Sequence, residues 1–303
     1  MAHHSWGGEY DEFDENDELD DNGRLCAACE DGDIERAWRL MTHGANPRAR
    51  ESLALRLAAE NGRTECVKML VTIASPREKK SEALANAATN GHVECARLLL
   101  PVSNAAENES LALRMAARHG HAECEALLIP FSNAQARSSE ALQWALLGGY
   151  AECVRLLTPV SDTERWADGP LCIAACYGHA ECVKELIALV DPKHNGSEAL
   201  AMAAKHGHLE CVKLLLPVSH NILRKQELLM TAIEAGNGSV VAAMFDLNSR
   251  LSAVLDLAEE AATAAKKGRQ KLAEVLRSTA EKWEMLRSTT EAKDSGGQGP
   301  RRL

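Results

Sequence analysis

The sequence predicts an all-α solenoid of about nine helix–turn–helix repeats, and three observations support this fold class. Six cysteines recur at intervals of 29 residues, at Cys66, Cys95, Cys124, Cys153, Cys182 and Cys211. Each lies in one local pattern, seen most fully at residues 207–215 as Gly-His-x-Glu-Cys-Val-x-Leu-Leu. Apolar residues make up 46% of the chain and aromatic residues only 4%, a composition typical of closely packed short helices. A fixed period of this size indicates stacked copies of one small unit.

The first helix of each unit is predicted from four equivalent positions. The units start with residues that can cap a helix, at Ser52, Ser81, Ser110, Ser139, Asp168, Ser197 and Gln226. A Leu follows three residues after each start, an Ala six residues after it and a Gly ten residues after it. Apolar residues at helical spacing, between a capping residue and a Gly, predict a short helix that ends at the Gly. The repeated Ala lets a neighbouring helix approach closely.

The second helix follows the Gly and, in the unit from Ser197, is predicted over about residues 209–216. Its exposed side has a Glu and, three residues later, a Lys or Arg, which stabilise a helix as a pair. This pairing recurs at Glu65–Lys68, Glu94–Arg97, Glu152–Arg155, Glu181–Lys184 and Glu210–Lys213. A proline then ends the helix in four units, at Pro101, Pro130, Pro159 and Pro217. A linker of about nine residues leads to the next unit.

The array is predicted over residues 22–288, between disordered tails at residues 1–21 and 289–303. It comprises an N-terminal unit, the regular units and a polar closing unit, at residues 22–51, 52–254 and 255–288. Terminal units of a solenoid must present one face to water, so their irregular sequences are expected.

Composition excludes several classes of function. No stretch of 18 apolar residues is present, so we expect no membrane span. Ten cysteines without an export signal indicate free thiols in a reducing compartment, and we expect a cytoplasmic monomer. Outside residues 1–21 the chain has 34 basic and 35 acidic residues, so its surface is not one that binds nucleic acid.

The repeat resembles the ankyrin repeat. Residues 169–175, Gly-Pro-Leu-Cys-Ile-Ala-Ala, are similar to the start of that unit, and a Gly-His junction and a Val/Leu-rich second helix follow. The opening unit is similar at residues 32–35 and 43–47. These units have 29 residues where ankyrin units have about 33, and the difference falls in the linker. The family forms a β-hairpin finger there, so we expect plain loops here. The resemblance implies a non-catalytic module that binds a protein partner.

The cysteines and histidines raise the alternative of a metal or enzymatic site around Cys172 and Cys176. With His179 and Cys182 these residues could form a Cys3His zinc set. His179 and Cys182, however, occupy positions that recur in other units, and the periodic cysteines behave as small core residues. No group of Ser, His and Cys stands apart from the repeat. We therefore expect no metal, no cofactor and no enzymatic activity.

Sequence variation is concentrated eight and nine residues after each unit start, at positions that face the concave groove in the ankyrin family. In the middle of the array these positions become apolar, and aromatic residues lie nearby, as in the hot spot of an interface. The candidate partner-binding residues are Arg118, His119, Leu147, Tyr150, Trp166, Cys176, Tyr177, Lys205 and His206. An alternative for Tyr150 and Trp166 is that they only seal an irregular junction between units.

Two questions about function stay open at this point. The array could serve an endogenous adaptor, or a secreted or injected effector or inhibitor that grips a target protein. Residues 9–21 include nine acids, and residues 1–21 contain no Lys or Arg, which is typical of a solvating tail. Tyr10, Phe13 and Leu19 leave the alternatives of a docking motif for a basic partner or a cover for the concave face near Arg118 and Lys205.

Overall fold

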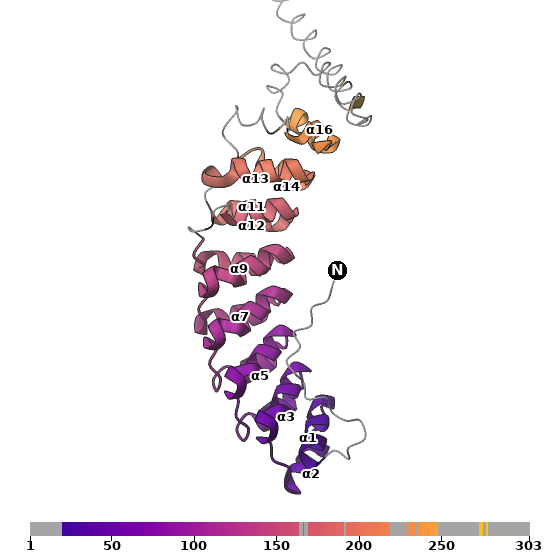
Figure 1. Cartoon of the computed structure of the whole chain (residues 1–303), viewed down its shortest axis with the longest axis vertical. Helices are drawn as coiled ribbons and strands as arrows, with labels where there is room; N and C mark the ends of the chain where they lie inside the picture. Colours follow the sequence, from indigo (N-terminus) through magenta and orange to yellow (C-terminus); the bar gives the residue numbers. More distant parts are fainter. Residues whose placement is uncertain are drawn as a thin grey trace, which may run out of the picture. The chain divides into compact units, whose positions relative to one another are not determined.

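The computed structural model describes residues 20–163, 166, 169–190, 192–218, 228, 231–233, 235–247, 273–274 and 277 (Figure 1). All regular secondary structure in these residues is helical, which confirms the predicted all-α solenoid. The linkers there are turns and bends without a strand, as their short length predicts. The chain divides into two compact units, residues 1–133 (unit 1) and residues 134–303 (unit 2), and each is described by itself.

Unit 1 consists of helix pairs that stack in two layers. Its helices are α1 (Asp21–Asp31), α2 (Ile34–Thr42), α3 (Ala49–Glu60), α4 (Thr64–Leu70), α5 (Glu78–Thr89), α6 (Val93–Leu99), α7 (Glu107–His119) and α8 (Ala122–Leu128), followed by the 3-10 turn η1 (Ile129–Phe131). The first helices of the pairs, α1, α3, α5 and α7, pack on one another in order, and Figure 1 shows them as successive rungs. The second helices, α2, α4, α6 and α8, form the other layer.

Unit 2 repeats this arrangement. Its elements are α9 (Ala136–Gly148), α10 (Ala151–Leu157), the 3-10 turn η2 (Thr158–Val160), α11 (Gly169–Tyr177), α12 (Ala180–Leu189), α13 (Pro192–His206), α14 (Leu209–Leu215) and α16 (Gly238–Leu247). Helices α9, α11 and α13 form one layer, and α10, α12, α14 and α16 form the other. The expected closing unit falls outside the described residues except for Ala273, Glu274 and Arg277. The residues 1–19 and 289–303 of the expected tails also lie outside them.

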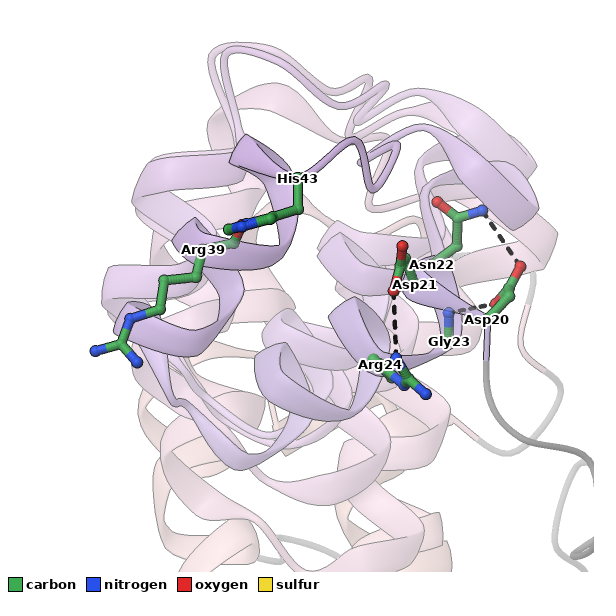
Figure 2. A network of polar contacts seen from close by, with 7 residues as sticks. All are labelled: Asp20, Asp21, Asn22, Gly23, Arg24, Arg39 and His43. Carbon is green, nitrogen blue, oxygen red and sulfur yellow. Dashed lines mark hydrogen bonds and ion pairs between the residues drawn. The ribbon is translucent and has the colours of Figure 1, made fainter.

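The N-terminal boundary of the array lies two residues earlier than the sequence predicts. Helix α1 begins at Asp21, and Asp20 is its N-cap: Oδ1 of Asp20 accepts a hydrogen bond of 2.7 Å from the backbone N–H of Gly23. This backbone hydrogen bond holds the pKa of the Asp20 carboxyl below its usual value. Figure 2 shows Asp20 at the start of α1 with Asn22 and Gly23 turned toward it. The last two acids of the acidic run therefore belong to the first repeat and not to the tail.

The core of each repeat comes from the predicted apolar positions. The Leu three residues after the unit start is at most 2% exposed at Leu55, Leu84, Leu113, Leu142, Leu171 and Leu200. The Ala six residues after the start is fully buried, and each of the six periodic cysteines is at most 1% exposed. Small residues at these positions let the helices of adjacent repeats pack at close range. The predicted Glu–Lys and Glu–Arg pairs of the second helices are all formed, on the exposed side.

The Gly-His junction connects neighbouring repeats. The Nε2–H of His92 donates to the carbonyl of Glu60 at 2.9 Å, and a Cβ on Gly62 would lie only 2.5 Å from the His92 ring. The acceptor lies 32 residues earlier, in the preceding repeat. We call this arrangement the inter-repeat clip. Its members are His92, His121, His179 and His208, with Arg63 and Asn237 as equivalents at two further junctions.

Four of the serines at the unit starts, Ser52, Ser81, Ser110 and Ser139, do not cap helices, contrary to the sequence-based expectation. Ser52 is buried, and its Oγ accepts a hydrogen bond of 3.0 Å from the backbone N–H of Ser75, in the next linker. Ser81, Ser110 and Ser139 make the same contact 23 residues ahead. The backbone conformation explains why these serines do not cap the helix. Each is the last residue of a short segment at positive φ, directly before the right-handed helix. Left-handed segments are unfavourable for residues other than Gly, by about 1–2 kcal/mol per residue.

Candidate functional site

The nine candidate residues fall into the two compact units. Arg118 and His119 end helix α7 in unit 1. The other seven, Leu147, Tyr150, Trp166, Cys176, Tyr177, Lys205 and His206, belong to unit 2. The apolar candidates therefore belong to the same compact unit as Lys205 and His206, whereas Arg118 and His119 belong to the other unit.

The unit 2 candidates lie mainly at the C-terminal ends of the first helices. Leu147 is in the last turn of α9, Cys176 and Tyr177 end α11, and Lys205 and His206 end α13. Tyr177 is 56% exposed and Leu147 is 39% exposed, whereas Cys176 is half-buried. Lys205 and His206 are exposed. We call these five residues the variable strip of unit 2. It presents apolar side chains followed by polar ones.

The inter-repeat clips hold this strip in place. The Nε2–H of His179 donates to the carbonyl of Leu147 at 3.1 Å, and that of His208 donates to the carbonyl of Cys176 at 2.9 Å. Tyr177 stacks on His179 with ring centroids 6.2 Å apart and an angle of 8° between the rings. Each clip histidine therefore fixes the backbone of the preceding repeat, and His179 also supports an aromatic ring, which gives the strip a defined geometry before any partner binds.

Tyr150 occupies the clip position of its repeat but packs differently. A Cβ on Gly148 would lie 2.2 Å from Cε2 of Tyr150, so the ring lies directly on the Gly148 backbone. Tyr150 nevertheless remains exposed to solvent. Because Gly148 has no side chain, the phenol ring can cover the end of α9. Tyr150 thus packs on Gly148 within its own repeat and remains exposed.

Trp166 is half-buried in the linker before α11. Its backbone N–H donates to the carbonyl of Thr163 at 3.2 Å, which folds the linker back. Its indole Nε1 is buried and has no hydrogen-bond acceptor among the residues that the structure describes. A buried indole N–H normally has a hydrogen-bond acceptor, so the Trp166 indole is unusual. It lies in a linker next to the candidate interface.

In unit 1, His119 stacks on the clip histidine His121 at a centroid distance of 6.3 Å. Burial, then the charges of Arg118 and His121, lower the pKa of His119. The imidazole is therefore neutral at physiological pH and offers a hydrogen-bonding ring, so that Arg118 supplies the positive charge of this pair.

The residues proposed for zinc are not assembled into a site. Among the described residues, no group of three or more His, Cys, Asp or Glu side chains is close enough to hold a metal ion. Cys172 and Cys182 are buried, and the Nε2–H of His179 donates to the Leu147 carbonyl. Burial raises the pKa of Cys182 to about 11, so its thiol is protonated and a poor metal ligand at neutral pH.

None of the ten cysteines forms a disulfide in the structure, and nine of them are buried. Burial also raises the pKa of Cys124 and Cys211 to about 11. We expect iodoacetamide at pH 8 to alkylate the half-buried Cys176 at least ~10-fold faster than the buried thiols, because only an accessible thiolate reacts. Peptide mass spectrometry against time measures this. Cys176→Ser should abolish the fast phase, and urea should make every thiol reactive. Equal rates for Cys182 and Cys176 in the native protein would contradict the prediction.

The structure shows a second apolar surface that the sequence analysis missed. Large apolar residues are exposed at one equivalent position of the linkers, 21 residues after the unit start. They are Ile73, Val102 and Phe131 in unit 1 and Val160 and Leu189 in unit 2. Their 29-residue spacing could have identified them. Val102, Phe131 and Val160 directly follow helix-ending prolines, so the sequence there indicates only the beginning of a loop.

Comparison with known proteins agrees with this architecture. A family model described as ankyrin repeats in three copies matches residues 25–109, 84–164 and 171–254. The chain therefore belongs to the ankyrin repeat family. The crystal structure of the human ASB11 ankyrin repeat domain is similar, with 26% sequence identity and a TM-score of 0.53. That match covers 64% of this chain and 97% of the ASB11 chain. A search of curated protein sequences finds no match.

Ankyrin repeats are generally modules for protein–protein interaction. In the described part of this chain, no helix combines the length and the apolar character needed to cross a membrane.

Proposed function

We propose that this chain is a non-catalytic adaptor that binds a protein partner through the variable strip of unit 2. The observation that carries the proposal is the exposure of Tyr177 and Leu147 on a strip whose backbone is fixed by clips. Interfaces gain most of their binding energy from a few rigid aromatic anchors surrounded by polar groups. A preorganised anchor loses little conformational entropy on binding, which favours affinity.

Each candidate residue has a distinct role in this proposal. Tyr177 is the central anchor, and Leu147 and Tyr150 extend the apolar surface at the end of α9. Lys205 and His206 form the polar rim at α13, where they exclude water and select an acidic or hydrogen-bonding partner group. Trp166 contributes the exposed part of its half-buried ring to the apolar surface. In unit 1, Arg118 and His119 are a separate candidate for a polar contact with a partner.

The buried thiols, none of which forms a disulfide, support a reducing intracellular location, and we propose that the protein acts in the cytoplasm as a monomer. The face that binds corresponds to the concave groove of the family. The partner is a protein, because the strip combines aromatic, aliphatic and mixed polar groups without the basic surface that a nucleic acid requires.

Affinity measurements on strip variants test the proposal. Tyr177→Ala or Trp166→Ala should weaken partner binding by ~1–3 kcal/mol, because truncation removes an aromatic anchor, and the melting temperature should stay close to that of the wild type. The partner is first captured from cell extract by the wild-type chain and identified by mass spectrometry. Titration calorimetry with the purified partner then gives the affinities.

Lys184→Ala is the matched control. Lys184 is exposed on α12 and pairs with Glu181 at 3.5 Å on the outer side of the second-helix layer. It should leave the affinity unchanged, because exposed ion pairs contribute little. If the Tyr177 and Trp166 variants bound normally while Lys184→Ala bound weakly, the partner would occupy the opposite face and the strip would not be the site.

A further inference from the structure

The linker edge of unit 1 has an exposed apolar ridge, formed by Ile73, Val102 and Phe131, of which Phe131 is 59% exposed. The three residues are equivalent positions of consecutive repeats, so neighbouring members are about 10 Å apart, the spacing of packed helices. The backbone below the ridge is fixed. Nε of Arg48 donates to the carbonyl of Ile73 at 2.8 Å, and Nε of Arg77 donates to the carbonyl of Val102 at 3.3 Å.

Basic side chains surround the first part of the ridge. Arg48, Arg50, Arg77 and Lys79 are all exposed, at or just before the starts of α3 and α5. Lys79 pairs with Glu51 at 3.0 Å. Within the part of the chain that the structure describes, neither Arg48 nor Arg77 has a carboxylate partner, although each has guanidinium N–H groups beyond the one that its backbone acceptor uses. The edge therefore combines apolar side chains with unneutralised positive charge.

The N-terminal segment of the chain joins the array at this same edge. Asp20, the N-cap of α1, pairs with Arg50 at 3.3 Å, and Asn22 Oδ1 accepts from the backbone N–H of Asn46 at 2.7 Å. Figure 2 shows Asp20 at this point, beside the first turn of α1. Residues 1–19 are therefore attached beside the linker that contains Arg48, whose side chain reaches Ile73.

The 19 residues before Asp20 are complementary to the ridge. They include seven acids, at Glu9, Asp11, Glu12, Asp14, Glu15, Asp17 and Glu18. They contain no Lys or Arg, and their large apolar side chains are Trp6, Tyr10, Phe13 and Leu19. A segment of this length can extend about 60 Å, whereas the distance from Ile73 to Phe131 is about two repeat spacings, or about 20 Å. Tyr10 and Phe13 are about 10 Å apart in an extended chain, close to one repeat spacing.

We propose that residues 1–19 dock in cis along the linker edge of unit 1. The acids lie against Arg48, Arg77 and Lys79, and the aromatic side chains lie against Ile73, Val102 and Phe131. Composition alone favours a solvated tail, because exposed ion pairs contribute little individually. Here the Asp20–Arg50 pair holds the C-terminal end of the segment at the edge. Several weak contacts can therefore form intramolecularly, at a high effective concentration. This surface is separate from the variable strip of unit 2, and the inference does not depend on the proposed function.

Zero-length carbodiimide cross-linking of the full chain, analysed by peptide mass spectrometry, tests this arrangement. Carboxylates of residues 9–18 should join to Lys79 about fivefold or more above Lys68 and Lys184, because docking raises the effective concentration of the two groups. Lys68 and Lys184 are suitable controls, since their side chains are more exposed than that of Lys79, 66% and 62% against 47%. Salt at about 0.5 M should reduce the excess, because it screens exposed charges.

Variants separate the charge and apolar contributions. Arg48→Glu with Arg77→Glu should lower the Lys79 cross-link several-fold, and Tyr10→Ser with Phe13→Ser should do so without changing the array. Arg97→Glu, on the exposed side of α6, is the matched charge control and should have no effect. Circular dichroism melting of each variant confirms that the array is folded.

Three results would overturn the proposal. The first is equal cross-linking of residues 9–18 to Lys79, Lys68 and Lys184. The second is an equal loss of the Lys79 cross-link with Arg97→Glu. The third is seen in a mixture of ¹⁴N- and ¹⁵N-labelled chains: mixed-isotope Lys79 cross-links would show that the segment binds a second copy and not its own array.

Discussion

Replacing Gly91 with Ala should lower the free energy of unfolding by about 2–3 kcal/mol, because the added methyl group strains the backbone and displaces a histidine ring. Gly91 has φ +73°, and a Cβ there would lie 2.5 Å from Nδ1 of His121. The left-handed backbone costs an L-residue about 1–2 kcal/mol. Displacing the His121 ring also lengthens its 2.9 Å hydrogen bond to the Thr89 carbonyl, which contributes about 1 kcal/mol.

Gly44→Ala is the matched control, because Gly44 has φ +107° but no neighbouring atom lies within 4 Å of the position that a Cβ would take there. Gly44→Ala therefore measures the cost of a side chain at positive φ without any contact with a histidine ring. Urea unfolding followed by circular dichroism gives both free energies, and hydrogen exchange locates the loss to α5–α8. Adding His121→Ala to Gly91→Ala should relieve the clash, so the double variant should lose less than the sum. A Gly91→Ala cost no larger than that of Gly44→Ala would show that the ring contact does not constrain the junction.

Arg114→Met should lower the free energy of unfolding by about 2 kcal/mol, although it keeps most of the aliphatic side chain. Arg114 is buried, and it supports the left-handed segment at the start of α7. Its Nε donates to the carbonyl of Glu109 at 3.0 Å, and its Nη2 donates to the carbonyl of Asn108 at 3.1 Å. Without these charged donors, residues at positive φ lose the contacts that offset their strain.

Arg97→Met controls for the loss of a positive charge, because Arg97 is exposed and makes only a surface pair with Glu94. It should change the free energy by less than about 0.5 kcal/mol. Asn108→Gly, introduced into the Arg114→Met chain, should recover part of the loss, since Gly adopts positive φ without strain. The same denaturant series measures all three. Equal effects of Arg114→Met and Arg97→Met would mean that the left-handed segment is stable without the Arg114 contacts.

The helices themselves could be predicted because their determinants are local. The second helix expected over about residues 209–216 is found as Leu209–Leu215, and its Glu210–Lys213 pair forms. The serines show where local inference fails. Ser52 precedes an apolar helical pattern, as an N-cap does, but its hydroxyl binds an N–H in the next linker. That partner becomes available only when two repeats stack, so a single repeat contains no information about it.

For the candidate site, the sequence could predict which residues are exposed but not how they pack. Variation and apolar character identified Leu147 and Tyr177, and both are exposed. Sequence could not show that Tyr150 covers Gly148, because this contact depends on a ring orientation. Nor could it show that Arg118 and His119 belong to a different compact unit from the rest, since the period of the repeat continues unchanged through residue 133.

The clip and the buried serine share a property with a consequence for how such an array can change in evolution. One contact reaches back 32 residues and the other forward 23, so each crosses a single boundary between repeats. Duplication or loss of one whole 29-residue unit would leave every such contact with an equivalent partner. The number of repeats can therefore change without a change of fold, because each of these contacts involves only two neighbouring repeats.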